Sequence, residues 1–483
     1  ITLFDGAGGS SGVAAQANGS GNILLQTLGD SAADITVATA ADIVSGSGNI
    51  SILAADSVVF GGDADIRTSS TSTSTGTIDV EAGSGGSLSM AASSLFTSSG
   101  ANGHVRLLAD QNVTLGDIVG AGKVSITATA GGILDADALV GADNDADIDV
   151  SASALRLNAA VGVGQSVNQL ETMVTTISAR AAGGGIHLTE SDGLTVGDVG
   201  LSVNRVNEKG TTSTAGSTDA VQSDIRTTSG NGDIVLSTLN GGITLNDGSA
   251  ADDDTAISAH GSGNILVQAG ETSTATDAFI KANADIESGS GNIVVQAADG
   301  ITFYNVGTTD AADIRTSSTG SGSGSVAVTS TTGAITQQTR SVIASSGASS
   351  MVTLLAATQV TVSAVDAESG TATITAGSGS IVDADSTGDS DLDINVENLR
   401  LIAGNGIGSG ANHLEISVAN LSANAGAGGL YLSETDALTI GTVLAQSGLT
   451  SAGNIVVSSG GNLTNDSAIS AAGNLLLDVS GDL

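Results

Sequence analysis

Short runs of alternating aliphatic and polar residues recur along this chain, and each run is introduced by a glycine and a polar residue. Clear examples lie at residues 21–25, 48–52, 76–80, 263–267 and 291–295. Alternation with a period of two, punctuated by Gly, Ser, Asn and Asp, is the sequence signal of β-strands. Neighbouring runs are about 20 to 28 residues apart, a spacing that fits one coil of a β-solenoid per run.

A second repeat is ten times longer. Residues 1–24 return at 243–266, residues 65–70 at 313–318, and residues 155–157 at 399–401. We therefore predict tandem modules at residues 1–242 and 243–460, with the start of a third module at residues 461–483. Residues from about 200 to 228 have no counterpart in the second copy and are predicted to form an inserted loop.

The predicted fold is all-β: a right-handed parallel β-helix, or β-solenoid, built from these tandem modules. Its narrow interior suits Val, Ile, Leu and Ala, and the chain has only five Phe, two Tyr and no Trp. Proline is absent, as expected where each backbone N–H bonds to the next coil. Glycine and asparagine are expected at the corners, where a positive φ costs them little. The repeated asparagines should stack as amide ladders: Asn22, Asn49, Asn264, Asn292, Asn454 and Asn474.

The charge balance excludes some classes of function. The 483 residues include 12 Lys and Arg against 50 Asp and Glu, which gives a formal net charge of −38. Such a surface repels nucleic-acid phosphates, so we expect no nucleic-acid partner. With 40% hydrophobic residues the chain is not of the disordered type, and it holds no apolar run long enough to insert into a membrane. Because it begins at Ile1 within a repeated run, we expect a fragment of a longer protein.

Several phrases resemble those of giant bacterial exoproteins of the filamentous haemagglutinin-like type. They lie at residues 103–110, at 131–137, and at 406–408 leading to 412–415. The resemblance is one of repeat style and extends over nearly the whole chain. It implies a right-handed parallel β-helix that is extracellular or held at the bacterial cell surface, with a role in adhesion, biofilm or fibre formation.

Two acidic clusters are candidate calcium sites, because Ca²⁺ takes roughly six to eight oxygen ligands. Neither cluster has the residue order of an EF-hand, and the alternative is a row of solvated carboxylates on the outer side of a strand. The candidate ligands are Asp143, Asp145, Asp147, Asp389, Asp391 and Asp393. Further aspartates flank them: Asp135, Asp137, Asp149, Asp383 and Asp385.

Residue types that support enzyme chemistry are scarce. The four histidines (His104, His187, His260 and His413) form no local motif, and the chain has no Cys. Sugar-binding enzymes need aromatic platforms, which seven aromatic residues hardly supply. We therefore expect no enzyme, and a polysaccharide-degrading β-helix is a distant alternative.

The sequence thus favours an extracellular structural or adhesive solenoid that forms a rigid rod or fibre. Its expected partners are further modules or copies of itself, joined end to end, and a component of a cell surface or matrix. The alternative is a calcium-dependent surface protein whose acidic loops bind ions.

Overall fold

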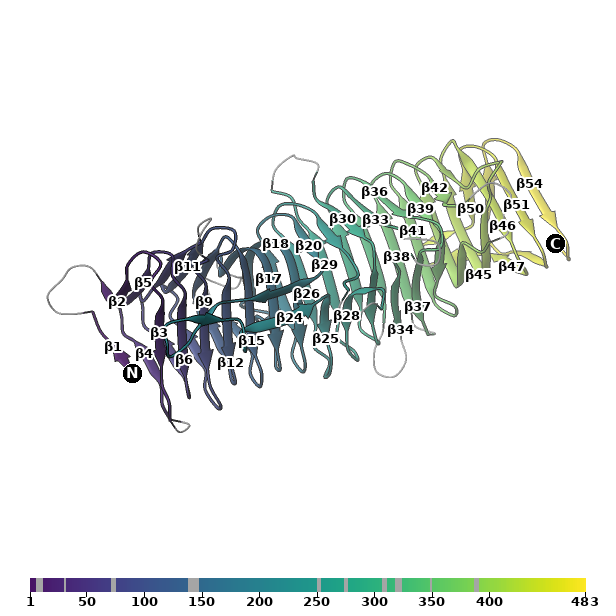
Figure 1. The fold of residues 1–483 in the computed structure, drawn as a ribbon. Coiled ribbons are helices and arrows are strands. Elements are labelled where there is room, and N and C mark those ends of the chain that lie inside the picture. Colours follow the sequence, from purple (N-terminus) through teal and green to yellow (C-terminus); the bar gives the residue numbers. More distant parts are fainter. Residues whose placement is uncertain are drawn as a thin grey trace. The chain divides into compact units, whose positions relative to one another are not determined.

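The structure is a computed structural model, and it describes residues 1–5, 12–29, 32–70, 75–137, 147–249, 253–272, 277–305, 311–317, 324–347, 350–385 and 391–483. Every regular element in this part of the chain is a β-strand (Figure 1). The strands stack as parallel ladders from coil to coil, so the predicted parallel β-solenoid is confirmed. The chain divides into two compact units, Ile1–Ser237 with Gly248–Asp252, and Thr238–Asp247 with Asp253–Leu483.

In the first unit each coil contributes up to three strands, and each strand pairs with its equivalent in the next coil. The first ladder contains β1 (Thr2–Leu3), β4 (Ile35–Val37), β7 (Val58–Phe60), β10 (Leu88–Met90), β13 (Val113–Leu115) and β16 (Ile133–Asp135). The second contains β2 (Val13–Ala17), β5 (Asp42–Ser45), β8 (Ile66–Ser69), β11 (Leu95–Ser99) and β14 (Asp117–Gly120). The third contains β3 (Ile23–Gln26), β6 (Ile50–Ala54), β9 (Ile78–Ala82), β12 (Val105–Ala109) and β15 (Lys123–Ala128). The next two coils each have one long strand that belongs to both the second and the third ladder, β17 (Val150–Ala159) and then β18 (Leu170–Ala181). The last strands of the unit are β19 (Ile186–Glu190), β20 (Leu194–Val196), β25 (Ile225–Thr227) and β26 (Ile234–Thr238).

The second unit repeats this plan. Its first ladder contains β27 (Ile243–Leu245), β30 (Phe279–Ala282), β33 (Gly300–Phe303), β36 (Ala334–Gln337), β39 (Val360–Val362), β42 (Ile381–Asp383) and β44 (Gly406–Ile407). The second ladder contains β28 (Thr255–Ala259), β31 (Asp285–Ser288), β34 (Ile314–Ser317), β37 (Val342–Ser346) and β40 (Ala364–Asp366). The third contains β29 (Ile265–Ala269), β32 (Ile293–Ala297), β35 (Val326–Ser330), β38 (Met351–Ala356) and β41 (Thr371–Ala376). The long strands are β43 (Ile394–Ala403) and β45 (Leu414–Ala425), and the last strands are β46 (Gly429–Glu434), β47 (Leu438–Ile440), β50 (Leu449–Ser451), β51 (Ile455–Ser459), β52 (Leu463–Asn465), β53 (Ile469–Ala471) and β54 (Leu475–Val479).

Alternate residues of each strand point inward and form the core. In β6, for example, Ile50 and Ile52 are 0% exposed, and they stack in register on Ile78 and Val80 of β9. This repeated stacking of branched aliphatic side chains explains the composition, because each rung fits the shape of the one below it. The few large side chains pair locally: the Phe60 and Phe96 rings meet edge to face, with their centroids 4.7 Å apart.

The repeated Gly-Asn corners work differently from the prediction in one respect. Neither Gly48 nor Gly291 has a positive φ, and no Asn among the described residues has one. Instead, a Cβ on Gly48 would overlap the carbonyl oxygen of Gly21 one coil away, and Gly291 faces Gly263 in the same way. Glycine is needed here because successive coils approach so closely at the corner.

The predicted asparagine ladders are confirmed within each unit. The Asn49 amide donates to Oδ1 of Asn22 (3.1 Å), and the Asn292 amide donates to Oδ1 of Asn264 (3.2 Å). Near the end of the chain the backbone N–H of Asn474 donates to Oδ1 of Asn454 (2.8 Å). The role of asparagine is therefore to satisfy corner N–H groups that no strand reaches, at an ordinary φ.

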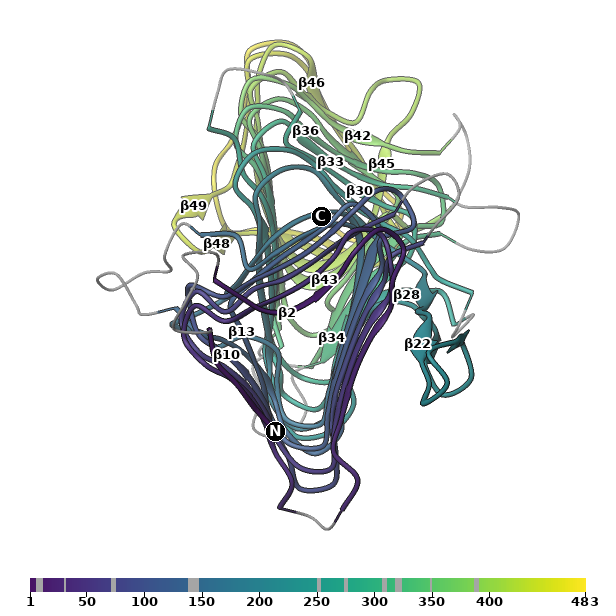
Figure 2. The ribbon, with the colours of Figure 1, turned by 60° about the vertical axis from the view of Figure 1, so that its left-hand side comes forward.

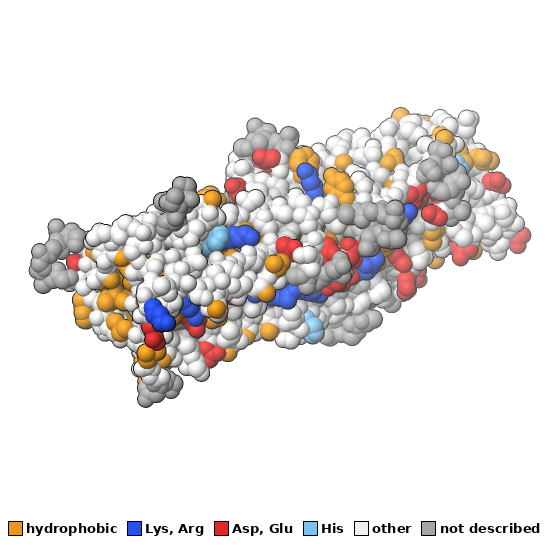
Figure 3. Space-filling view, in the orientation of Figure 1, with side chains coloured by type: hydrophobic (Ala, Val, Ile, Leu, Met, Phe, Trp, Pro, Cys, Tyr) orange, Lys and Arg blue, Asp and Glu red, His pale blue; other side chains and the backbone are white. Residues whose placement is uncertain are grey.

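Rare cations join neighbouring coils through carboxylates. Arg67 pairs with Asp42 (3.1 Å) and Asp65 in the first unit. Arg315 pairs with Asp285 (2.7 Å) and Asp313 in the second. Figure 3 shows Lys and Arg side chains beside acidic ones at several places on the visible face. Among the described residues no helix could cross a membrane.

The predicted inserted loop is a β-hairpin that lies across the third ladder of the first unit. It is made of β21 (Val199–Ser202), β22 (Arg205–Val206), β23 (Thr212–Ser213) and β24 (Thr218–Gln222), which pair antiparallel. Figure 2 shows β22 outside the stacked coils. The hairpin runs back over successive coils, since Lys123 Nζ donates to Gly200 O and the backbone N–H of Val206 donates to Ser51 Oγ. In the second unit only β48 (Thr442–Val443) and β49 (Gln446–Ser447) remain at this point of the repeat.

Candidate functional site

The structure gathers acidic side chains at the same place in both units, around the connection from β16 to β17 in the first unit and from β42 to β43 in the second. In the first unit Asp135, Asp137 and Asp149 each place one carboxylate oxygen within 4.8 Å of the others. In the second unit Asp383, Asp393 and Glu415 do the same. We call these two groups the carboxylate clusters. A third such group lies elsewhere in the second unit and contains Glu271, Asp277 and Asp299.

Local hydrogen bonds fix the first carboxylate cluster. Asp135 is the last residue of β16, and its Oδ1 accepts from the backbone N–H of Asp137 (2.7 Å). Its Oδ2 accepts from the Asn168 amide (2.6 Å), which a tight turn holds in place. Asp149 precedes β17, and its Oδ2 accepts from the backbone N–H of Glu171 (2.7 Å).

The second cluster repeats these bonds. Asp383 accepts from the backbone N–H of Asp385 (2.7 Å) and from the Asn412 amide (2.6 Å). Asp393 accepts from the backbone N–H of Glu415 (2.8 Å). A conformation that recurs with the same donors and nearly the same lengths in two modules is a property of the repeat.

Burial makes the charge of these clusters costly. Asp149 and Asp393 are each 2% exposed. Burial raises the pKa of Asp149 well above its ordinary value, and the nearby charge of Asp135 raises it further. Burial likewise raises the pKa of Asp393, with Asp383 adding to the effect. Two carboxyl groups in one buried place are stable when they share a proton or when a cation replaces it.

The sequence located this region but not the whole cluster. Of the predicted ligands, Asp393 lies in a cluster, whereas Asp147 and Asp391 are exposed beside them. Asp143, Asp145 and Asp389 lie outside the described residues. Sequence reasoning missed Asn168, Asn412 and Glu415. The signal that could have found them is a repeated Asn-x-Leu-Glu, at residues 168–171 and 412–415.

A buried glutamate occupies equivalent places in the two units. Residues 173–175 of β18 lie between the part that pairs with β19 and the part that pairs with β20. Glu190, which is 0% exposed, accepts there from the backbone N–H of Val174 (3.0 Å) and from Thr172 Oγ1 (2.8 Å). Glu434 accepts from the backbone N–H of Val418 (3.1 Å) in the same way. Burial raises the pKa of Glu190 to about 7 and that of Glu434 to about 8.

The histidines lie in separate surroundings. His104 Nδ1 accepts from the backbone N–H of Lys123 (2.9 Å), and burial lowers the pKa of His104. The His413 ring lies 6.0 Å from the ring of Tyr431. These contacts give both rings a structural role at coil corners.

No family model matches this chain, and no similar curated protein or solved structure was found.

Proposed function

We propose that this chain is a structural or adhesive segment of an extracellular bacterial fibre or surface protein, and that it has no enzymatic role. The observation that carries the proposal is the in-register stacking of the same aliphatic and asparagine positions through both units. Such stacking makes each coil a template for the next, which suits a stiff scaffold that lengthens by module duplication. The resemblance in repeat style to filamentous haemagglutinin-like proteins points the same way.

An adhesion measurement tests this proposal. Beads coated with the chain should be retained on bacterial cell surfaces or on extracellular matrix under flow, more than beads coated with an unrelated protein of equal negative charge. Sedimentation over a range of concentrations should in parallel reveal self-association through module ends. Equal retention of the two kinds of beads, together with a monomer at every concentration, would contradict the adhesive and filament-forming role.

The carboxylate clusters favour a second candidate, a calcium-dependent surface protein. We propose Asp135, Asp137 and Asp149 as oxygen ligands in one unit, and Asp383, Asp393 and Glu415 in the other. Three convergent carboxylates fit a hard cation that prefers oxygen, and the cluster recurs in both units. A bound Ca²⁺ would neutralise charge that is otherwise buried at a cost.

Calcium titration is expected to release protons as well as heat. Because Asp149 and Asp393 have raised pKa values, Ca²⁺ must displace a proton near neutral pH. We expect two ions per chain, each of which stabilises the native state by about 2.7 kcal/mol at a hundredfold excess over Kd. Asp149→Asn and Asp393→Asn should each remove one ion, whereas Asp466→Asn, at an exposed position, should remove none. Calorimetric titration in two buffers of different ionisation enthalpy measures the number of Ca²⁺ ions bound and the number of protons released. If no heat is detected, and if Ca²⁺ also leaves the thermal unfolding midpoint unchanged, the calcium role is excluded.

A further inference from the structure

The two units differ in what covers the outer side of the third ladder, and the difference leaves polar atoms unpaired in the second unit. In the first unit Ser125, Arg156 and Ser178 stand on three successive rungs. The equivalent rungs of the second unit carry Thr373, Arg400 and Ser422, also in register. We call these two sets the crossing rows.

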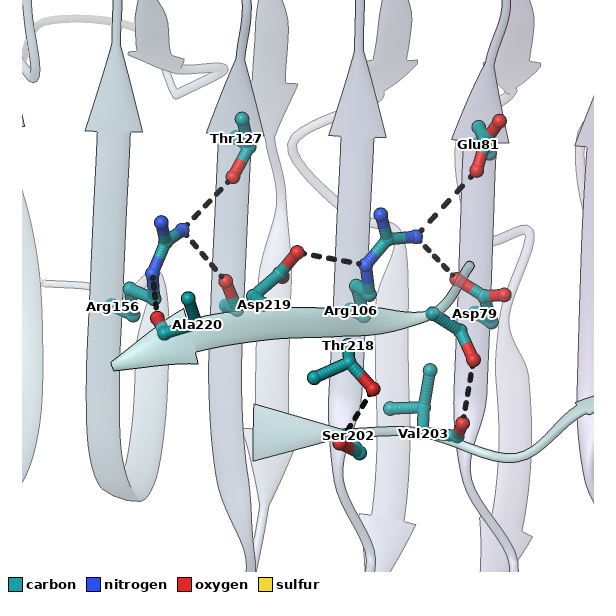
Figure 4. Close-up of polar contacts among 12 residues, drawn as sticks. Asp79, Glu81, Arg106, Thr127, Arg156, Ser202, Val203, Thr218, Asp219 and Ala220 are labelled. Carbon is teal, nitrogen blue, oxygen red and sulfur yellow. Dashed lines mark hydrogen bonds and ion pairs between the residues drawn. The ribbon is translucent and has the colours of Figure 1, made fainter. Parts of the chain in front are cut away.

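Strand β24 of the hairpin satisfies the first crossing row. Arg156 Nε donates to the carbonyl oxygen of Ala220 (3.2 Å), and the Gln222 amide lies 3.4 Å from Ser178 Oγ. Arg156 also reaches Ser125 Oγ (3.4 Å). Figure 4 shows β24 crossing the ladder, with Asp219 between Arg106 and Arg156. Burial lowers the pKa of Arg156, and the charge of Asp219 opposes that shift.

The second crossing row lacks this strand. Between Val443 and Gln446 the second unit has only a tight turn, where the first unit has the whole hairpin. Gln446 still folds back onto the ladder, because its side-chain oxygen accepts from the backbone N–H groups of Ala423 (3.1 Å) and Asn424 (3.0 Å) of β45. In the first unit the Gln222 amide likewise bonds to the backbone at Leu157. The segment that would correspond to residues 218–220 is therefore missing, while the base of the hairpin is kept.

The polar atoms under the missing strand have no partners. Thr373 Oγ1, Arg400 Nε and Ser422 Oγ are all buried and form no hydrogen bond. Ser422 is 0% exposed and Thr373 is 8% exposed. Beside them, Met351 and Leu355 of β38 are 40% and 43% exposed. A buried polar atom without a partner costs free energy that a bound group can recover.

We propose that the second crossing row is a docking site for an extended, carboxylate-bearing peptide segment of a partner. The segment crosses the ladder as β24 does in the first unit: a backbone carbonyl accepts from Arg400 Nε, a carboxylate faces the guanidinium, and aliphatic side chains cover Met351 and Leu355. Charge complementarity favours this occupant, because Arg400 is one of only 12 cations in a chain of net charge −38. The first unit supplies the precedent for the geometry within the same molecule.

The test uses the full chain and a fluorescent peptide that copies residues 216–223, which include Asp219. The peptide should bind at one site per chain, and binding should weaken as the salt concentration rises. Arg400→Ala, and separately a peptide with Asp219→Asn, should weaken binding at least about tenfold. Lys281→Ala removes an exposed cation of the same unit and should change nothing. No binding by the wild-type chain, or equal binding by Arg400→Ala, would overturn the proposal.

The hydroxyl groups allow a second measurement that does not depend on the charge. Since Thr373 Oγ1 and Ser422 Oγ are unpaired, Thr373→Val and Ser422→Ala should leave the unfolding midpoint unchanged or raise it. Thr373→Val should also weaken peptide binding, whereas Ser422→Ala, at a position that is 0% exposed, should not. In the first unit Ser178→Ala should instead lower the midpoint, because the Gln222 amide loses an acceptor. A lower midpoint for the Thr373 and Ser422 variants would mean that this row is already satisfied, and would refute a docking site there.

Discussion

Raising the pH from about 5 to about 8 is expected to lower the thermal unfolding midpoint of this protein, by roughly 5 °C or more. Glu190 and Glu434 contribute to this fall, and the buried carboxyls of Asp149 and Asp393, whose pKa values are also raised, act in the same direction. Each glutamate is buried and accepts backbone hydrogen bonds from a long strand, at the gap between the parts of that strand that pair with two different strands of the next coil. Burial raises their pKa values to about 7 and about 8, whereas an unfolded glutamate titrates near its ordinary value.

The direction of the effect follows from proton counts. Below about pH 4 both states hold the proton, and the groups have no influence on stability. Between the unfolded and the folded pKa the native state binds more protons, so stability falls as the pH rises, and the loss is complete above about pH 8. Each glutamate contributes on the order of 3–5 kcal/mol to this loss. The net charge of −38 acts in the same direction through self-repulsion.

Neutral variants separate the buried glutamates from the general charge. Glu434→Gln imitates the protonated side chain, so it should match the wild type at pH 5 and be more stable at pH 8. Glu190→Gln should behave alike, and the two effects should add because the residues are far apart in sequence and lie in different units. Glu397→Gln, at an exposed position of β43, is the control and should keep the slope of the wild type. Circular dichroism at several pH values gives the midpoints, and a flat wild-type profile would rule out this account.

The fold could be predicted almost entirely from the sequence because the same local pattern of residues recurs in each coil of a solenoid. Alternation such as Ile50-Ser51-Ile52 determines which side chains face inward, and the recurrence of the run determines the stacking. The role of Gly48 could not be predicted in the same way. Its φ is ordinary, and the need for glycine comes from a carbonyl of the neighbouring coil, a contact that local sequence does not encode.

The candidate sites were less predictable for a related reason. The calcium sites were predicted from carboxylates that are close together in the sequence, yet Asp147 is exposed while Asp149 is buried. The partners of Asp149 come from elsewhere in the fold: Asp135 is at the end of the preceding coil, and the Glu171 N–H is on the next one. Rules based on the spacing of ligands within a single loop cannot predict a site whose residues come from three coils.

Removing the Asp79 carboxylate is expected to be the most damaging single change in the first unit. Asp79 is 0% exposed, and its two oxygens accept from Arg106 Nη1 (3.0 Å) and Arg205 Nε (2.6 Å). Arg106 also pairs with Asp219 of the hairpin (3.1 Å) and has a side chain only 6% exposed. Asp79→Ala leaves a buried guanidinium without its main counter-charge, which costs about 3–5 kcal/mol. Hydrogen exchange should then show loss of protection over the hairpin, residues 199–222.

The second unit supplies the matched control for this experiment. Its rungs carry Ala327 and Thr353 where the first unit has Asp79 and Arg106, and it stacks in the same register without the ion pair. The double variant Asp79→Ala with Arg106→Thr should therefore be more stable than Asp79→Ala alone, because the buried Arg106 guanidinium that lost its Asp79 counter-charge is gone. The hairpin should stay unprotected in both variants, since Arg205 has lost Asp79 in both, and Asp219 has also lost Arg106 in the double variant. If the two substitutions instead add, or if the hairpin keeps its protection in Asp79→Ala, the ion pairs are not what holds the hairpin on the solenoid, and backbone contacts such as Val206 N–H to Ser51 Oγ must do so.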